Sequence, residues 1–147
     1  MSLLDYFDNE SKNKLTKESI NQGNVYLKDF DEATHKKLFI IAGTDKQKLL
    51  ICSVFINSEI HPAIFNKPKQ LNLQVFIKKL NNNFLKHDSF ANCAYPIKLD
   101  GEEISKQIQD GTCKYKGMIN MSDLLEIQKV LINSNLLSEE EIELYFK

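Results

Sequence analysis

Two uninterrupted apolar runs of strand length constrain the fold of this chain more than any other feature of its sequence. The first run covers residues 38–42 and the second covers residues 49–56, with the polar residues 44–48 between them. Two apolar runs joined by a short polar turn are typical of an antiparallel hairpin. We therefore expect a β-sheet that contains this hairpin.

Further strands are expected on both sides of the hairpin. Residues 24–30 are rich in side chains that favour strands. In residues 71–75 apolar and polar side chains alternate, as they do in a half-buried strand. One more strand is expected at residues 89–97 and a short one at residues 118–121.

Helices are expected mainly towards the two ends of the chain. The expected helices are residues 11–21, residues 100–111, a helix that Ser122 caps, and a last helix from Ser138 to Phe146. Gly23 and Gly111 follow the first two helices, in the place of a usual C-terminal cap. Ser138 and Glu141 form a capping-box pattern at the start of the last helix.

These elements predict an α+β fold, which is either a small β-barrel or a curled antiparallel sheet with an N-terminal helix and C-terminal helices. The 147 residues suit a single domain, and no repeat or linker divides them. We expect a helical N-terminal extension at 1–22, a barrel with an inserted short helix at 23–121, and C-terminal helices at 122–147.

The charge of the chain is balanced, and its basic residues are all of one kind. The 19 basic residues are lysines, with no arginine, and 20 acidic residues bring the net charge to -1. The chain as a whole is therefore not expected to attract nucleic acid, although a local patch of basic residues could still exist. The absence of arginine matters because arginine is the usual bidentate partner of phosphate.

The three cysteines predict a reducing compartment. Their number is odd, their spacings match no zinc pattern, and Cys52 and Cys93 lie in apolar runs where they are expected to be buried. The N-terminal residues lack the pattern of a secretory signal, and no run approaches the ~20 apolar residues of a membrane helix. We expect a cytoplasmic protein that does not span a membrane.

The order of elements resembles the MazF/PemK family of bacterial toxins. The resemblance lies mostly in hydrophobic positions and covers about residues 23 to 133. The stretches that resemble the family's strands and closing helix are residues 23–30, 35–42, 49–58, 89–93, 117–119 and 122–127.

This resemblance implies an SH3-like barrel that cleaves single-stranded RNA without a metal or cofactor. It also implies an antitoxin protein as partner and a homodimer. We expect no DNA and no membrane partner. In the family, an Arg at the start of the second strand and a Thr or Ser after the third strand are catalytic. Here the first position falls on Lys36 or Lys37, and the second falls on Ser58 with Asn57 as the neighbouring possibility.

Metal-free RNA cleavage needs a base for the 2′-hydroxyl, an acid for the leaving oxygen and a donor that steadies the phosphate. His61 could act as base or acid near neutral pH, Lys36 or Lys37 could steady the phosphate, and Ser58 could hydrogen-bond to it. This hypothesis requires the side chains to converge at one end of the barrel. The alternatives are a solvent-facing His61 before Pro62, a solvated lysine turn and a turn-capping Ser58.

A second set of residues is expected to bind RNA. His35 lies beside the lysine pair, and Lys86 and His87 lie in another polar segment. His87 and Asp88 would point to opposite faces of an extended segment, which argues against a contiguous Ser-His-Asp triad. Lysines interleaved with phenylalanines between residues 67 and 90 suit either single-stranded RNA or a solvated face over an aromatic core.

The rival hypothesis is a catalytically inactive barrel that binds a protein or RNA. A lysine in place of the family's arginine favours this reading, because lysine cannot grip two phosphate oxygens in a planar fork. The element order and Ser58 favour the enzyme. The last helix carries apolar residues that could dock on a partner or on the chain's own barrel.

Overall fold

The fold is organised around the hairpin of β2 (Lys37–Asp45) and β3 (Leu50–Asn57). The computed structural model describes residues 8–45, 47 and 49–147, so expectations that concern residues 1–7, 46 and 48 lie outside the described residues. β2 and β3 pair antiparallel from Leu38 opposite Ile56 to Asp45 opposite Leu50. The predicted hairpin is confirmed, and β2 reaches further into the polar turn than its apolar run does.

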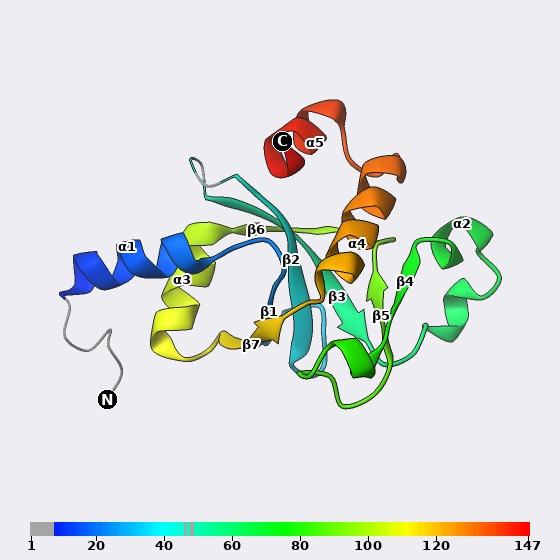
Figure 1. Cartoon of the computed structure of the whole chain (residues 1–147), viewed down its shortest axis with the longest axis horizontal. Helices are drawn as coiled ribbons and strands as arrows, with labels where there is room; N and C mark the ends of the chain where they lie inside the picture. The colour runs from blue at the N-terminus through cyan, green and yellow to red at the C-terminus, as the bar shows by residue number, and fades with distance from the viewer. Residues whose placement is uncertain (1–7, 46, 48) are drawn as a thin grey trace.

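Five more strands extend the hairpin into one curled antiparallel sheet (Figure 1). The strand order is β4 (Gln74–Ile77), β5 (Ser89–Asn92), β3, β2, β1 (Asn24–Lys28) and β7 (Lys114–Met118), and β6 (Ile97–Asp100) pairs with the first half of β3. Within the described chain the edge strands β4 and β7 do not pair with each other. The α+β class is confirmed, in the form of an open curled sheet and not a closed barrel.

The expected strand at residues 89–97 is wrong as a single element. The side chain of Asn92 accepts a hydrogen bond from the backbone N–H of Ala94 at 3.2 Å, and Pro96 has no N–H to donate to a ladder. The chain therefore turns after Asn92. β5 pairs with the end of β3 and β6 with its beginning.

Helices cover both faces of the sheet. α4 (Met121–Asn133) and α5 (Glu139–Phe146) pack on the face that carries Val25, Ile40 and Val54. α1 (Asn9–Ser19) and α3 (Gly101–Asp110) lie side by side on the opposite face, which carries residues such as Tyr26, Phe39 and Ile41 (Figure 1). Because neighbours along a strand point to opposite faces, the unbroken apolar runs of β2 and β3 supply both cores.

Shorter helices occupy the connections near β4. η2 (Pro62–Ile64) and α2 (Pro68–Leu71) lie between β3 and β4, and η3 (Lys79–Asn81) follows β4. The expected strand at residues 71–75 is therefore wrong in its first half. Pro68 starts α2 because proline suits the first turn of a helix, where its missing N–H costs nothing.

The expected caps Gly111 and Ser138 are confirmed, whereas Gly23 is not a cap, because α1 ends at Ser19 and its C-cap is Ile20. Asp100 accepts a hydrogen bond from the N–H of Glu102 at the start of α3, and Gly111 ends that helix in the left-handed conformation with φ of 85°. Ser138 and Glu141 form the reciprocal capping box that opens α5.

The start of α4 and the strand before it differ from the expectation. Asn120, not Ser122, caps α4, and its side chain accepts from the N–H of Ser122 at 2.9 Å. The expected strand at residues 118–121 is wrong, because β7 ends at Met118.

α5 docks on the chain's own sheet. Tyr145 is buried against β2, and a Cβ added to Gly43 would lie 2.7 Å from the backbone oxygen of Tyr145. Only a glycine allows this close approach. Across the described residues, no helix combines the length and apolar character that crossing a bilayer would require.

Candidate functional site

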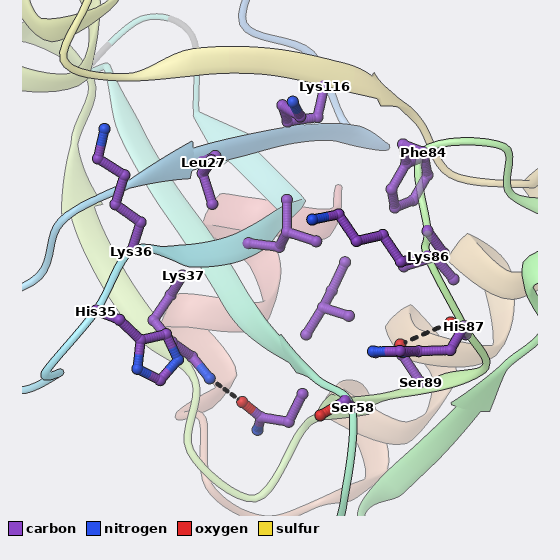
Figure 2. A pocket seen from close by; sticks show the side chains of 14 residues that line it. Leu27, His35, Lys36, Lys37, Ser58, Phe84, Lys86, His87, Ser89 and Lys116 are labelled. Atoms are coloured by element: carbon purple, nitrogen blue, oxygen red, sulfur yellow. Dashed lines mark hydrogen bonds between the residues drawn. The ribbon is translucent and has the colours of Figure 1, made fainter.

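A cavity of about 420 Å³ lies at the edge of the sheet where β2 begins and β3 ends (Figure 2). The antiparallel register explains why distant segments meet there. The end of β3 pairs with β5 through Asn57 opposite Phe90, so the residues that precede β5 lie beside those that follow β3. The volume falls in the range of ligand sites, roughly 300–1,000 Å³.

The cavity has an apolar floor and a cationic rim. Leu27, Leu38 and Ile56 come from three neighbouring strands, and Phe84 and Leu85 come from the segment before β5. The polar and charged residues of the described lining are His35, Lys36, Lys37, Asn57, Ser58, Lys86, His87, Ser89 and Lys116, with no carboxylate among them. Four lysines in a described lining without a carboxylate favour an anionic ligand.

Lys37 is the most tightly held of these cations. Its ammonium donates a hydrogen bond to the side-chain oxygen of Asn57 and lies 5.5 Å from the ring centroid of Phe55. Partial burial lowers the pKa of Lys37 below the ordinary lysine value. Lys36 is exposed, and in Figure 2 its ammonium points away from the centre of the cavity. Of the two sequence alternatives, Lys37 is therefore the better placed to meet a bound anion.

Two histidines lie on opposite sides of the cavity, and the ammonium of Lys86 points into its middle (Figure 2). His35 lies next to Thr34, whose hydroxyl is 3.3 Å from its Nδ1 atom. The backbone oxygen of His87 accepts a hydrogen bond from the Ser89 hydroxyl at 3.0 Å, which fixes the bend before β5. Both histidines are exposed and reachable by a ligand.

Ser58 lies between the two histidines in the same view (Figure 2). It is exposed directly after β3, and its hydroxyl has no hydrogen-bond partner in the described part of the chain. A turn-capping role for Ser58 is therefore not seen. Its hydroxyl is free to donate to a ligand.

His61 does not line the cavity. It caps η2, where its Nδ1 atom accepts from the N–H of Ala63 at 3.1 Å, and it lines a separate recess of about 230 Å³. The chain turns into η2 after Ser58, and this turn carries His61 away from the lysines. The side chains expected to converge therefore do so only in part, because His61 lies outside the cavity. The residues that the cavity does bring together are Lys36, Lys37, Ser58, His35, Lys86 and His87.

Lys116 is a lining residue that the sequence reasoning missed. Val25 pairs with Gly117 and Tyr26 pairs with Tyr115, so Lys116 is the extra residue of a β-bulge on β7. A bulge redirects a side chain and here brings Lys116 to the cavity. The only sequence signal was a lysine next to a glycine, which permits the φ of 150° at Gly117.

Other chemistries find less support in the described residues. Cys52, Cys93 and Cys113 are buried free thiols, and burial raises the pKa of each to about 12, which makes them poor nucleophiles. No group of three or more His, Cys, Asp or Glu side chains in the described chain is arranged to hold a metal ion.

Asp88 has a structural role next to the cavity. Its carboxylate accepts a hydrogen bond from the N–H of Lys79 at 2.9 Å and so ties η3 to the segment before β5.

A comparison of the chain with protein-family models finds none that matches, and a search of curated proteins finds no significant relative.

Proposed function

We propose that this chain is a metal-independent endoribonuclease of the MazF/PemK type that acts on single-stranded RNA, with the cationic cavity as its active site. One observation carries the proposal. Two histidines, a free serine hydroxyl and four lysines surround one cavity that the described acidic residues do not enter. A phosphodiester carries the negative charge that this lining would bind, and imidazole side chains can act as general acid and general base.

The placement of the histidines suits in-line displacement at phosphorus. One imidazole removes the proton from the 2′-hydroxyl, whose oxygen attacks the adjacent phosphorus and forms a 2′,3′-cyclic phosphate. The bond from phosphorus to the 5′-oxygen breaks, and the second imidazole donates a proton to that oxygen. Attacking and leaving oxygens lie on opposite sides of phosphorus, as His35 and His87 lie on opposite sides of the cavity (Figure 2).

The lysines replace the arginine of the family as anion binders. Lys37 is oriented by Asn57 and by the ring of Phe55, so its ammonium is a fixed point charge. Lys86 supplies a second charge from the other side of the cavity. Two separate ammonium groups can neutralise both non-bridging oxygens of the pentacovalent phosphate, which compensates for the absence of one planar guanidinium.

The test is cleavage of a mixed pool of single-stranded RNAs in EDTA by wild type, His87→Gln and Lys37→Met. We expect each variant to lose at least about a hundredfold in rate. Lys106→Met is the matched control for Lys37→Met, because Lys106 is an exposed lysine on α3 that lines neither the cavity nor the recess, and it should retain the wild-type rate. Wild-type rates in both His87→Gln and Lys37→Met would contradict the cavity as the active site.

A second candidate is a catalytically inactive binding module, and an exposed apolar stripe favours it. Met121, Leu125 and Ile132 follow one face of α4, Leu136 lies in the loop after it, and these residues are between 37% and 61% exposed. Such a stripe suits a protein partner. An antitoxin or a second copy of the chain is the partner that the resemblance to the family would place there.

Cleavage separates the two candidates. A binding module would retain RNA in the cavity without producing new RNA ends in EDTA. Under the enzyme proposal the chain works in the cytoplasm, where its three free thiols stay reduced and its RNA substrate is present. DNA is not a substrate, because the proposed attack requires a 2′-hydroxyl.

A further inference from the structure

A second recess adjoins the cationic cavity and shares Asn57 with it. This recess has a volume of about 230 Å³ and lies between the end of β3, the helices η2 and α2, and the turn between β5 and β6. The polar and aromatic residues that line it are Asn57, His61, Gln70, Gln74, Asn92 and Tyr95. The two hollows are therefore neighbours at Asn57.

The two hollows differ in charge. No lysine, aspartate or glutamate lines the recess among the described residues, whereas four lysines line the cavity. Three amides besides Asn57 dominate the recess instead. A nucleotide in single-stranded RNA also has one charged part and one neutral part. Its phosphate is charged, whereas its base is neutral and flat, with polar groups along its edge.

The amides of the recess form a connected set with free groups. Gln74 donates its Nε2 hydrogens to the side-chain oxygen of Asn92 at 2.8 Å and to the backbone oxygen of Gln70 at 3.3 Å. In the described chain the amide nitrogen of Asn92, the amide oxygen of Gln74 and the whole side-chain amide of Gln70 have no hydrogen-bond partner. Free donors and acceptors held side by side are what recognition of a base edge requires.

Tyr95 adds an exposed aromatic ring to the recess. Its side chain is 64% exposed, although the turn that carries it is fixed by the Asn92 side chain and followed by Pro96. An exposed ring on a turn that is held in place is accessible to a ligand in the recess. Aromatic side chains in RNA-binding proteins stack on unpaired bases.

We propose that this recess is a nucleobase subsite, which selects the base of a nucleotide whose phosphate occupies the cationic cavity. Gln70, Gln74 and Asn92 read the edge of the base, and Tyr95 stacks on its face. The inference rests on the proposed function, because the cavity must bind the phosphate. The inference assigns the preference of the protein for a particular RNA base to residues that take no part in the cleavage reaction.

The test uses short 2′-O-methyl oligonucleotides in which a single A, C, G or U is flanked by abasic nucleotides, with binding measured by fluorescence anisotropy. These probes cannot be cleaved by attack of a 2′-oxygen. We expect wild type to bind the preferred base about tenfold more tightly than the worst base. Gln70→Ala and Tyr95→Ala should each reduce that ratio to about threefold or less, with the dependence on salt unchanged.

Tyr115→Ala is the matched control, because Tyr115 is a similarly exposed tyrosine, at 56%, on β7 and outside both hollows. It should retain the wild-type base preference. An equal affinity of wild type for all four bases, or a preference that survives both Gln70→Ala and Tyr95→Ala, would overturn the subsite and leave the proposed function standing. Failure of wild type to bind any probe at low salt would overturn both.

Discussion

Replacement of Asn82 by alanine should destabilise the fold and loosen one wall of the cavity. Asn82 is 1% exposed and joins η3 to the start of α4. Its side-chain nitrogen donates to the backbone oxygen of Lys78 and to the carboxylate of Asp123, both at 2.9 Å. Its side-chain oxygen accepts from the N–H of Asn120 at 2.8 Å.

The expected loss follows from these three hydrogen bonds. Two neutral hydrogen bonds contribute about 1 kcal/mol each, and one to a carboxylate contributes about 1.5–3 kcal/mol. Allowing for water that partly replaces the lost amide, Asn82→Ala should lower the free energy of unfolding by about 3 kcal/mol. With an m-value of about 2 kcal/mol/M in urea, the midpoint should fall by roughly 1.5 M.

Urea denaturation followed by circular dichroism measures this change. Asn83→Ala is the control, because Asn83 is the exposed neighbour, and it should stay within about 0.5 kcal/mol of wild type. In the absence of urea, the Asn82→Ala variant should also cleave RNA more slowly than wild type, because Asn82 anchors the segment that carries Lys86 and His87. A loss below about 1 kcal/mol, or one equal to that of Asn83→Ala, would refute the assigned network.

Three further predictions concern stability. Gly43→Ala should lower the free energy of unfolding by about 1–3 kcal/mol in a urea titration, because the new Cβ would overlap the backbone of Tyr145, and an unchanged midpoint would contradict the close approach of α5. Lys37→Met should change the free energy of unfolding by less than about 1 kcal/mol at pH 7, because it removes a partly desolvated charge and also loses the hydrogen bond to Asn57, while cleavage falls at least about a hundredfold. Burial lowers the pKa of Lys37, so its charged form disfavours folding below that pKa and the penalty fades as pH rises; a loss of more than about 1 kcal/mol would show that the hydrogen bond to Asn57 outweighs this penalty. Finally, burial raises the pKa of Cys52 and Cys93 to about 12, above the ordinary thiol value of 9.0. Unfolded thiols therefore ionise first, and the free energy of unfolding should fall above pH 9 by up to about 1.4 kcal/mol per thiol per pH unit, whereas a flat profile from pH 8 to pH 10 would contradict the burial.

The hairpin and the capped helices were predictable because their signals are local. The apolar runs of β2 and β3 and the capping box at Ser138 depend only on neighbours in the sequence. β7 was not predictable in this way. Its residues are mostly exposed and carry no apolar pattern, and its position is set by pairing with β1. The N-cap of α4 was misplaced because both Asn120 and Ser122 suit a cap, and contact with Asn82 selects Asn120.

The candidate site was predictable only where the hairpin brings its parts together. Lys37 and Ser58 meet because the start of β2 and the end of β3 lie at one edge of an antiparallel pair. His87 joins them through the pairing of β3 with β5, which links segments that no local pattern connects. The exclusion of His61 depends on the direction of one turn, and the arrival of Lys116 depends on one bulge.

The most direct test of the central claim is the chemistry of the RNA ends produced in EDTA. An RNA that wild type cleaves should yield a 2′,3′-cyclic phosphate and a 5′-hydroxyl, which mass spectrometry can identify. A single 2′-deoxy nucleotide at the cleavage position should abolish the cut, because the attacking hydroxyl is absent. Products with a 5′-phosphate, or a cut that persists at the 2′-deoxy nucleotide, would contradict the proposed role of the cavity.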